Sequence, residues 1–247
     1  CMKKAILSFW YFIIGSWTLF NFTWLMLLCV PLVIVSILLH ERIGGRIGFI
    51  ILECWARLFS GLRGIFYKVV GREKIDSSQA YIYVANHGSY LDSPALVVAI
   101  PQQCRPLGKK EILSYPVFGF MFRYIGVTVD RSNPKSRWKS LEIIKGKLLK
   151  GINIMFFAEG TMNTTDHLLI PFKDGAFRLA IETATPIVPM AIHNSRNLLP
   201  RGSGELKSGV ITVEYGTPIS PEGKDLKTLK HETYQAIYQM LAKKQYS

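Results

Sequence analysis

The chain has 247 residues, enough for one α/β domain and an additional segment. Hydrophobic residues make up 49% of the chain, and its mean hydropathy of +0.21 is high for a soluble domain. The four cysteines form no Cys-x-x-Cys pair and lie at no metal-ligand spacing from a histidine, which argues against a disulfide framework or a zinc site.

An uncharged stretch covers residues 5–39. It is far longer than the apolar region of a signal peptide. As one helix it would extend about 50 Å, against about 30 Å for the hydrocarbon core of a membrane. Gly15-Ser16, Asn21 and Pro31 offer places for a break. Because both flanks are basic, we expect a helical hairpin that enters the membrane and returns to its starting, cytoplasmic side. The alternative is a single tilted span with Lys3 on the far side of the membrane.

Residues 47–69 follow with apolar side chains at helical spacing and charged residues between them. This pattern predicts an amphipathic helix. Such a helix suits a membrane surface or packing on the following domain.

After Gly71, short apolar runs alternate with stretches of helical pattern. The predicted strands cover residues 81–85, 125–129, 152–157, 187–192 and 210–215. The predicted helices cover residues 94–100, 116–124, 135–150, 174–184 and 226–244. The alternation predicts an α/β fold with a largely parallel central sheet flanked by helices. We therefore divide the chain into N-terminal membrane-associating helices over residues 1–70 and an α/β domain over residues 71–247.

The formal net charge is +13, and residues 105–150 carry a net +8 of it. Such a segment attracts nucleic acid, lipid headgroups or phosphorylated small molecules, or it is simply a solvated face. The apolar N-terminal segment favours anionic lipid. Nucleic acid is not expected as a partner, because no zinc-finger or RRM-type motif is present.

Polar clusters follow three of the predicted strands, at Asn86–Asp92, Asp130-Arg131 and Glu159–Thr161. In open α/β sheets, ligands bind beyond the carboxyl ends of the strands. His87 and Asp92 would diverge on a regular helix but can meet on a strand-to-helix loop. Asp92 would then accept a hydrogen bond from one ring nitrogen and leave the other as a general base. A helix-capping Asp beside an incidental His explains the same spacing.

Six short blocks, all between residues 80 and 192, resemble the signature of the HX4D glycerolipid acyltransferases and occur in the same order. They are N-H-x-x-x-x-D at 86–92, G-K-K-E with Y-P-V-F-G at 108–119, G-V-T-V-D-R at 126–131, F-A-E-G-T at 157–161, P-F-K-D-G-A at 171–176 and P-I-V-P at 186–189. Each block is weak by itself, but the ordered set is specific. No such motif covers residues 1–70.

The resemblance implies transfer of a fatty acyl group from a thioester donor to the free sn-2 hydroxyl of lysophosphatidate, giving phosphatidate. His87 would be the general base and Asp92 would orient it. The alkoxide would attack the thioester directly, without an acyl-enzyme, and no G-x-S-x-G nucleophile motif is present.

The resemblance also implies a substrate-binding set. Arg131 and Lys173 would hold the phosphate, which needs charge-assisted donors. Backbone N–H groups near Gly160 would stabilise the oxyanion. Lys109, Glu159 and Thr161 would complete the site.

No metal or organic cofactor is implied. The co-substrate would be acyl-CoA or acyl-acyl carrier protein, both of which are anionic. The expected partners are lysophosphatidate, the acyl thioester, membrane phospholipids and, where it carries the donor, acyl carrier protein. The expected location is the cell membrane, with the catalytic residues 71–247 on its cytoplasmic face.

One departure leaves the acceptor open. Met162 stands where the family often has arginine. Glycerol-3-phosphate or a lysophospholipid with a larger headgroup is therefore an alternative acceptor. A non-catalytic membrane protein that binds anionic lipid would need the apolar segment and the basic region, but not His87 and Asp92.

Overall fold

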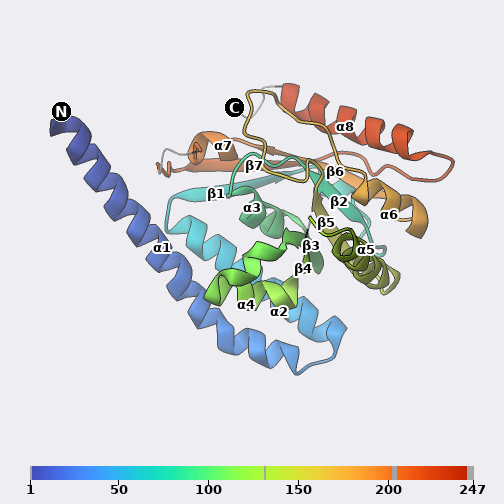
Figure 1. The fold of residues 1–247 in the computed structure, drawn as a ribbon, viewed down its shortest axis with the longest axis horizontal. Coiled ribbons are helices and arrows are strands. Elements are labelled where there is room, and N and C mark those ends of the chain that lie inside the picture. Colours follow the sequence, from blue (N-terminus) through green and yellow to red (C-terminus); the bar gives the residue numbers. More distant parts are fainter. Residues whose placement is uncertain (1, 131, 202–204, 244–247) are drawn as a thin grey trace.

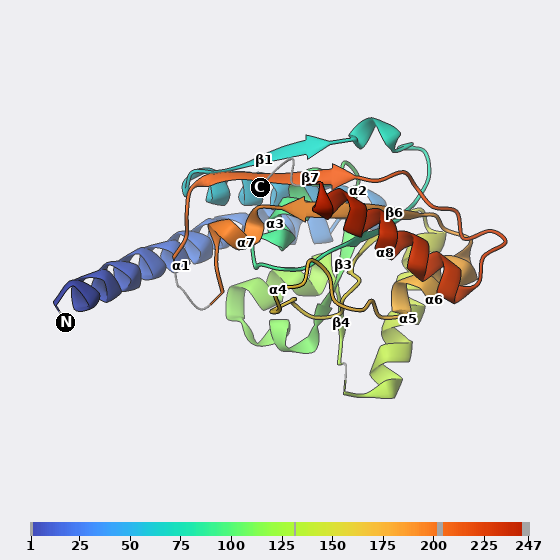
Figure 2. The same cartoon turned by 90° about the horizontal axis from the view of Figure 1, so that it is seen from above.

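The computed structural model describes residues 2–130, 132–201 and 205–243. Within these residues the chain forms a seven-stranded sheet in the order β1-β7-β6-β2-β5-β3-β4 (Figures 1 and 2). The strands are β1 (Ile65–Val70), β2 (Ile82–Ala85), β3 (Cys104–Lys109), β4 (Val127–Val129), β5 (Asn153–Phe157), β6 (Ile187–His193) and β7 (Gly209–Tyr215). All neighbours pair in parallel except β6 and β7. The predicted largely parallel α/β sheet is confirmed.

The helices alternate with these strands along the chain. They are α1 (Met2–Ile37), α2 (Glu41–Gly61), α3 (Asp92–Ala99), α4 (Pro116–Ile125), α5 (Pro134–Leu149), α6 (Gly175–Thr183), α7 (Ser195–Leu198) and α8 (Leu226–Ala242), with short 3-10 helices at Arg72–Lys74 and Lys110–Ser114. The five helices predicted after residue 71 are confirmed within a few residues.

Two apolar layers bury the two faces of the sheet. Tyr83 and Ala85 of β2 pack in a cluster with α2, α3 and α4. Ile82 and Val84 of the same strand pack in a second cluster with α5, α6 and α8. Figure 1 shows these two groups of helices on opposite sides of the sheet. Because alternate residues of a strand point to opposite faces, β2 must be apolar throughout.

Two strands differ from the sequence-based prediction. The helix predicted over residues 47–69 ends at Gly61, and the chain enters β1 at Ile65. Apolar residues at 62, 66 and 69 satisfy a helical and a strand pattern equally in so short a run. β3 was not predicted either, because its sequence C-R-P-L-G-K has few strand-forming residues. β1 lies at one edge of the sheet beside β7, although it precedes the proposed boundary at residue 70 (Figure 2).

The prediction of a hairpin within residues 5–39 is wrong. α1 continues through Asn21 and Pro31, and the chain reverses only between Ile37 and Glu41. The side-chain amide of Asn21 donates to the Trp17 carbonyl 2.7 Å away, so this polar group is satisfied inside the helix. The hairpin is formed instead by α1 and α2 together (Figure 1).

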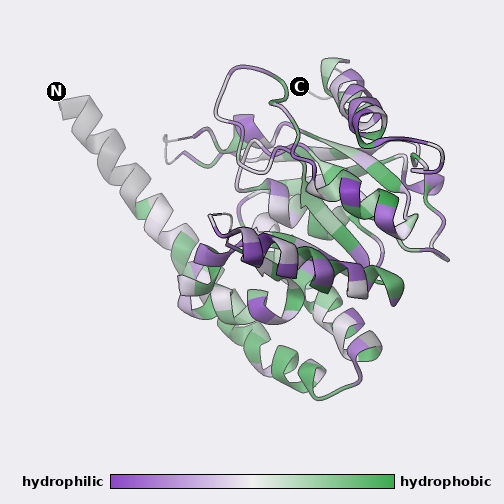
Figure 3. Cartoon of the chain, turned by 45° about the vertical axis from the view of Figure 1, so that its right-hand side comes forward, coloured by the Kyte–Doolittle hydropathy of each residue, from purple (hydrophilic) through white to green (hydrophobic). Residues whose placement is uncertain are grey.

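One narrow stripe of α1 packs against the rest of the protein. Its members recur every three or four residues and are Phe22, Met26, Cys29, Val33 and Ser36. The other faces expose large apolar side chains, among them Trp17, Phe20, Trp24, Leu28 and Leu32. Figure 3 shows hydrophobic residues, in green, along the later part of α1. Gly15–Ile37 is the one helix in the described part of the chain that is long and apolar enough to cross a membrane.

Gly44 sets how closely α1 and α2 can approach. A Cβ atom at this position would lie 1.9 Å from the Ser36 backbone carbonyl oxygen. We expect Gly44→Ala to lower the free energy of unfolding by about 1–3 kcal/mol, because a backbone atom cannot move aside as a side chain can. The measurement is thermal unfolding in detergent. In Gly146→Ala the new Cβ meets nothing within 4 Å in the middle of α5, so this control should be neutral or stabilising by up to about 1 kcal/mol.

Candidate active site

The pairing of β2 with β5 brings together two of the predicted polar clusters. Ala85 lies opposite Phe157 in the parallel register, and the Ala158 N–H donates to the Ala85 carbonyl at 3.2 Å. His87 lies two residues after Ala85, and Glu159 lies two residues after Phe157. The two residues therefore lie side by side just beyond the carboxyl ends of neighbouring strands, as expected for a site in an α/β sheet.

Asp92 is the first residue of α3, and none of its surface is exposed. Its Oδ2 atom accepts hydrogen bonds from the Gly88 and Ser89 N–H groups, both at 2.7 Å. The same oxygen lies 2.9 Å from His87 Nδ1. A carboxylate held by two backbone donors is an acceptor, so Nδ1 carries the proton and donates to it. The tight turn over residues 87–92 thus brings His87 and Asp92 together, and the side chain of Asp92 does not cap α3.

The imidazole of His87 is held on one face by Phe157. The two rings stack with centroids 3.9 Å apart and planes 13° from parallel. The His87 side chain is 17% exposed, and Nε2 has no hydrogen-bond partner among the described residues. The ring therefore presents one free nitrogen with lone-pair character, which is what a general base requires.

Glu159 holds the backbone of His87. Its Oε1 atom accepts the His87 N–H at 2.8 Å, and its Oε2 atom accepts the Ile170 N–H at 3.0 Å. Burial raises the pKa of Glu159, while these two hydrogen bonds and the nearby charges of His87 and Arg196 oppose the rise. Glu159 was predicted to bind substrate, but in the described structure its carboxylate accepts hydrogen bonds from backbone N–H groups.

Asn86 joins the same loop to β6. Its side-chain oxygen accepts the Ile192 N–H at 2.8 Å, and its side-chain nitrogen donates to the Ile192 carbonyl at 3.1 Å. Both amide atoms are therefore used. The sequence assigned no role to Asn86, although its place directly before His87 was a signal.

The predicted substrate-binding residues lie at different positions along this edge of the sheet. Lys173 is exposed, and its N–H donates to the Ala158 carbonyl at 2.8 Å. Its Cγ would lie 2.8 Å from a Cβ at Gly160, which has φ +71°. Thr161 is exposed beside them, and Lys109 is exposed at the end of β3. Arg131 lies outside the described residues.

The Gly160 N–H is already used. It donates to the Phe157 carbonyl at 3.0 Å, which closes the turn after β5. The backbone N–H groups of Thr161 and Met162 have no partner among the described residues. An oxyanion site near Gly160 would therefore use these two donors.

Several lysines of the basic segment 105–150 form ion pairs within the protein. Lys147 and Lys150 form ion pairs with Glu41 of α2, and Lys145 pairs with Glu182 at 3.3 Å. Lys110 lies 3.7 Å from Asp130. The part of this segment at the end of α5 thus joins α5 to α2 and α6, and it is not all available to an anionic ligand.

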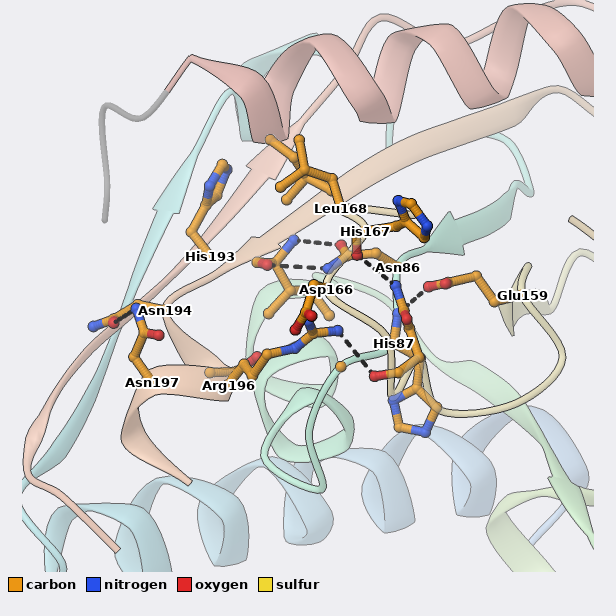
Figure 4. Close-up of a pocket in the computed structure, with 15 residues that line it drawn as sticks. Asn86, His87, Glu159, Asp166, His167, Leu168, His193, Asn194, Arg196 and Asn197 are labelled. Atoms are coloured by element: carbon orange, nitrogen blue, oxygen red, sulfur yellow. Dashed lines mark hydrogen bonds between the residues drawn. The ribbon is translucent and has the colours of Figure 1, made fainter. Parts of the chain in front are cut away.

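A cavity of about 500 Å³ lies beside the His87 backbone, and Figure 4 shows the residues that line it. His167, His193 and Arg196 line it, but the imidazole of His87 points away from it. No group of three or more His, Cys, Asp or Glu side chains that could hold a metal ion occurs among the described residues. No motif in the sequence marks Asn163, which lies in the loop after β5, or Arg196, which donates hydrogen bonds to that loop.

The paired amide of Asn86 allows a test of the architecture. We expect Asn86→Asp to lower the free energy of unfolding by about 1–3 kcal/mol, because a second oxygen would face the Ile192 carbonyl where a donor now lies. Denaturant unfolding in detergent measures it. Among the described residues, Asn133 bonds only through its side-chain oxygen, which accepts from the N–H groups of Lys135 and Ser136. Asn133→Asp should therefore be neutral, and equal losses in both variants would contradict the assignment.

Comparison with known proteins identifies relatives for most of this chain. The profile of the family described as Acyltransferase matches residues 67–193. The 1-acyl-sn-glycerol-3-phosphate acyltransferase of Cocos nucifera is 32% identical over 66% of this chain and 54% of its own length. The chloroplastic 1-acyl-sn-glycerol-3-phosphate acyltransferase BAT2 of Brassica napus is 33% identical over 77% and 55%. The matches thus span little more than half the length of these relatives.

A solved structure has the same fold. The crystal structure of the 1-acyl-sn-glycerophosphate (LPA) acyltransferase PlsC from Thermotoga maritima superposes with a TM-score of 0.79 at 21% identity, covering 96% of this chain and 99% of that one. The match to more than half of the chain, together with relatives above 30% identity, shows that the chain belongs to the acyltransferase family.

Proposed function

We propose that this chain transfers a fatty acyl group from a thioester donor to the free sn-2 hydroxyl of lysophosphatidate, giving phosphatidate. The observation that carries the proposal is the 2.9 Å contact between His87 Nδ1 and the fully buried Asp92 carboxylate, which leaves Nε2 free. The relatives named 1-acyl-sn-glycerol-3-phosphate acyltransferase support this choice of acceptor.

In the proposed mechanism, His87 Nε2 takes the proton of the acceptor hydroxyl as its oxygen attacks the thioester carbonyl. Asp92 stabilises the resulting imidazolium. The tetrahedral intermediate collapses by breaking its C–S bond, and the leaving thiolate takes the proton from His87. The new ester bond forms in one transfer, without an acyl-enzyme. Of the described cysteines, Cys104 is buried and Cys29 and Cys54 lie in α1 and α2, outside the site.

Charge stabilisation would come from the residues around Gly160. The Thr161 and Met162 N–H groups would donate to the oxyanion. Lys173, whose stem packs on Gly160, would bind the phosphate together with Arg131. Lys109 would assist from β3. The donor would be acyl-CoA or acyl-acyl carrier protein, with no metal or organic cofactor.

The N-terminal helices would hold this site at a membrane. The exposed apolar faces of α1 would lie in lipid, so that a lipid acceptor reaches His87 without leaving the interface. We propose residues 1–70 as the membrane-associating part and residues 71–247 as the catalytic part, on the cytoplasmic face of the cell membrane. β1 would then be the point where the first part joins the sheet of the second.

Met162 supports a second class of acceptor. An arginine is common in the family at this position, and methionine lacks its charge, so the phosphate site would be weaker. Such a site would accept glycerol-3-phosphate or a lysophospholipid with a larger headgroup. Purified protein in detergent, given each acceptor with each thioester and scored for the acylated product, decides among them. Phosphatidate formed from lysophosphatidate at the highest kcat/KM supports the proposal.

We expect His87→Ala to lower kcat by ~10²–10⁴-fold, because the hydroxyl loses its general base. Asp92→Asn should also lose most activity, since the imidazole would lose its anionic partner. The measurement is steady-state acyl transfer by protein whose thermal unfolding matches that of the parent. His231 is exposed on α8 and provides the control, since His231→Ala should keep full activity. Near-normal turnover of a folded His87→Ala protein would refute the mechanism.

We expect Lys173→Ala and Arg131→Ala to raise the KM for lysophosphatidate far more than the KM for the thioester, because each removes a charged donor to the phosphate. Initial rates with each substrate varied in turn measure this split. Lys227→Ala, on the exposed face of α8, should change neither constant. Equal changes in both KM values would contradict a phosphate role.

A further inference from the structure

The loop between β5 and α6 covers the peptide of His87. Glu159 lies near the start of this loop and Ile170 near its end, and Oε2 of Glu159 accepts the Ile170 N–H. The other carboxylate oxygen, Oε1, accepts the N–H of His87. From the middle of the loop, the Asn163 N–H donates to the His87 carbonyl at 2.7 Å. Both backbone polar groups of His87 are therefore bound by this one loop.

Asn163 organises the loop from inside. It is 3% exposed, in contrast to the exposed residues 164–168 that follow it. Its side-chain oxygen accepts from the N–H and the hydroxyl of Thr165, at 3.0 and 2.7 Å, and its side-chain nitrogen donates to the His167 carbonyl at 2.9 Å. The position of Asn163 thus sets the position of the donor to His87.

Arg196, from α7, holds this loop against the end of β6. Its Nη1 atom donates to the Thr165 carbonyl and its Nη2 atom to the Asn163 carbonyl, both at 2.9 Å. Figure 4 shows its side chain reaching from α7 toward the loop beside His87. A planar guanidinium can bind two carbonyl groups at once in fixed geometry, which an ammonium group cannot do.

The same guanidinium packs on the peptide that follows His87. A Cβ atom at Gly88 would lie 3.1 Å from Arg196 Nε and 3.3 Å from Nη2. Arg196 therefore contacts the His87–Gly88 segment directly and also binds the loop that holds His87. Its charge is one of those that oppose the rise in the pKa of Glu159.

We propose that Arg196 is a positioning residue for the acyl transfer, holding His87 in register with Asp92 through the loop that contains Asn163. The proposal rests on the function proposed above for this site. Arg196 does not touch the imidazole and is not itself catalytic. Its loss would leave both substrate sites in place while the base moves out of alignment.

The kinetic test compares Arg196→Ala and Arg196→Lys with the parent protein in detergent. Arg196→Ala should lower kcat by ~10²-fold with both KM values unchanged, as expected for a misplaced catalytic group. Arg196→Lys should recover little of this loss, because it restores the charge without the paired hydrogen bonds. Arg178 is exposed on α6 and pairs with Asp174 at 3.9 Å, so Arg178→Ala should match the parent.

Hydrogen–deuterium exchange gives a measurement that does not depend on turnover. In Arg196→Ala, peptides that contain the His87 and Asn163 amides should exchange faster, while those from β7 should not change. A parent protein that fails to acylate lysophosphatidate would refute the proposed function, and unchanged exchange would still refute the role of Arg196. Full activity of Arg196→Lys would show that a positive charge alone positions His87, and it would overturn the claim that the two guanidinium hydrogen bonds are needed.

Discussion

The parallel pairing of β2 with β5 is the constraint on which the site depends. Neighbouring strands lie about 4.8 Å apart, and Ala85 is opposite Phe157, so the residues that follow must meet just beyond the sheet. There the backbone N–H of His87 no longer has a strand partner. The Glu159 carboxylate accepts it instead, and Phe157 stacks on the ring. One pairing thus places His87, the Glu159 carboxylate that binds its backbone and the turn at Gly160.

Two buried carboxylates are stabilised by backbone donors in this site. Asp92 is held by the Gly88 and Ser89 N–H groups, and Glu159 by those of His87 and Ile170. Burying a polar group is costly unless hydrogen bonds replace its water. The donors belong to loops that follow strands, so they are free of sheet pairing. The two carboxyl groups therefore depend on the fold for their hydrogen bonds, and the loop conformations depend in turn on these two side chains.

The apolar surface and the polar site are joined by the same helices. The buried stripe of α1 packs with α2 and α4 in the core layer that also contains Tyr83 and Ala85 of β2. The remaining faces of α1 stay exposed and apolar, which in a folded protein marks a surface for lipid or for another protein. A lipid surface is the assignment we propose, because it would deliver a lipid acceptor to the edge of the sheet where His87 lies.

The sequence by itself determined the α/β class, the five helices after residue 71 and the strands that are continuous apolar runs. It also indicated the pairing of His87 with Asp92, which the structure then decided against a helix-capping role for Asp92. These features depend on local periodicity and on a turn of six residues, so residues close together in the sequence are enough to predict them. It did not determine β1 or β3, whose residues become strands only through pairing with neighbours. Nor did it determine the unbroken α1, in which Asn21 bonds within its own helix. The roles of Asn86, Asn163 and Arg196 were decided by tertiary structure, because each acts on a backbone group far away in the sequence that only the folded sheet and its loops bring within hydrogen-bond distance.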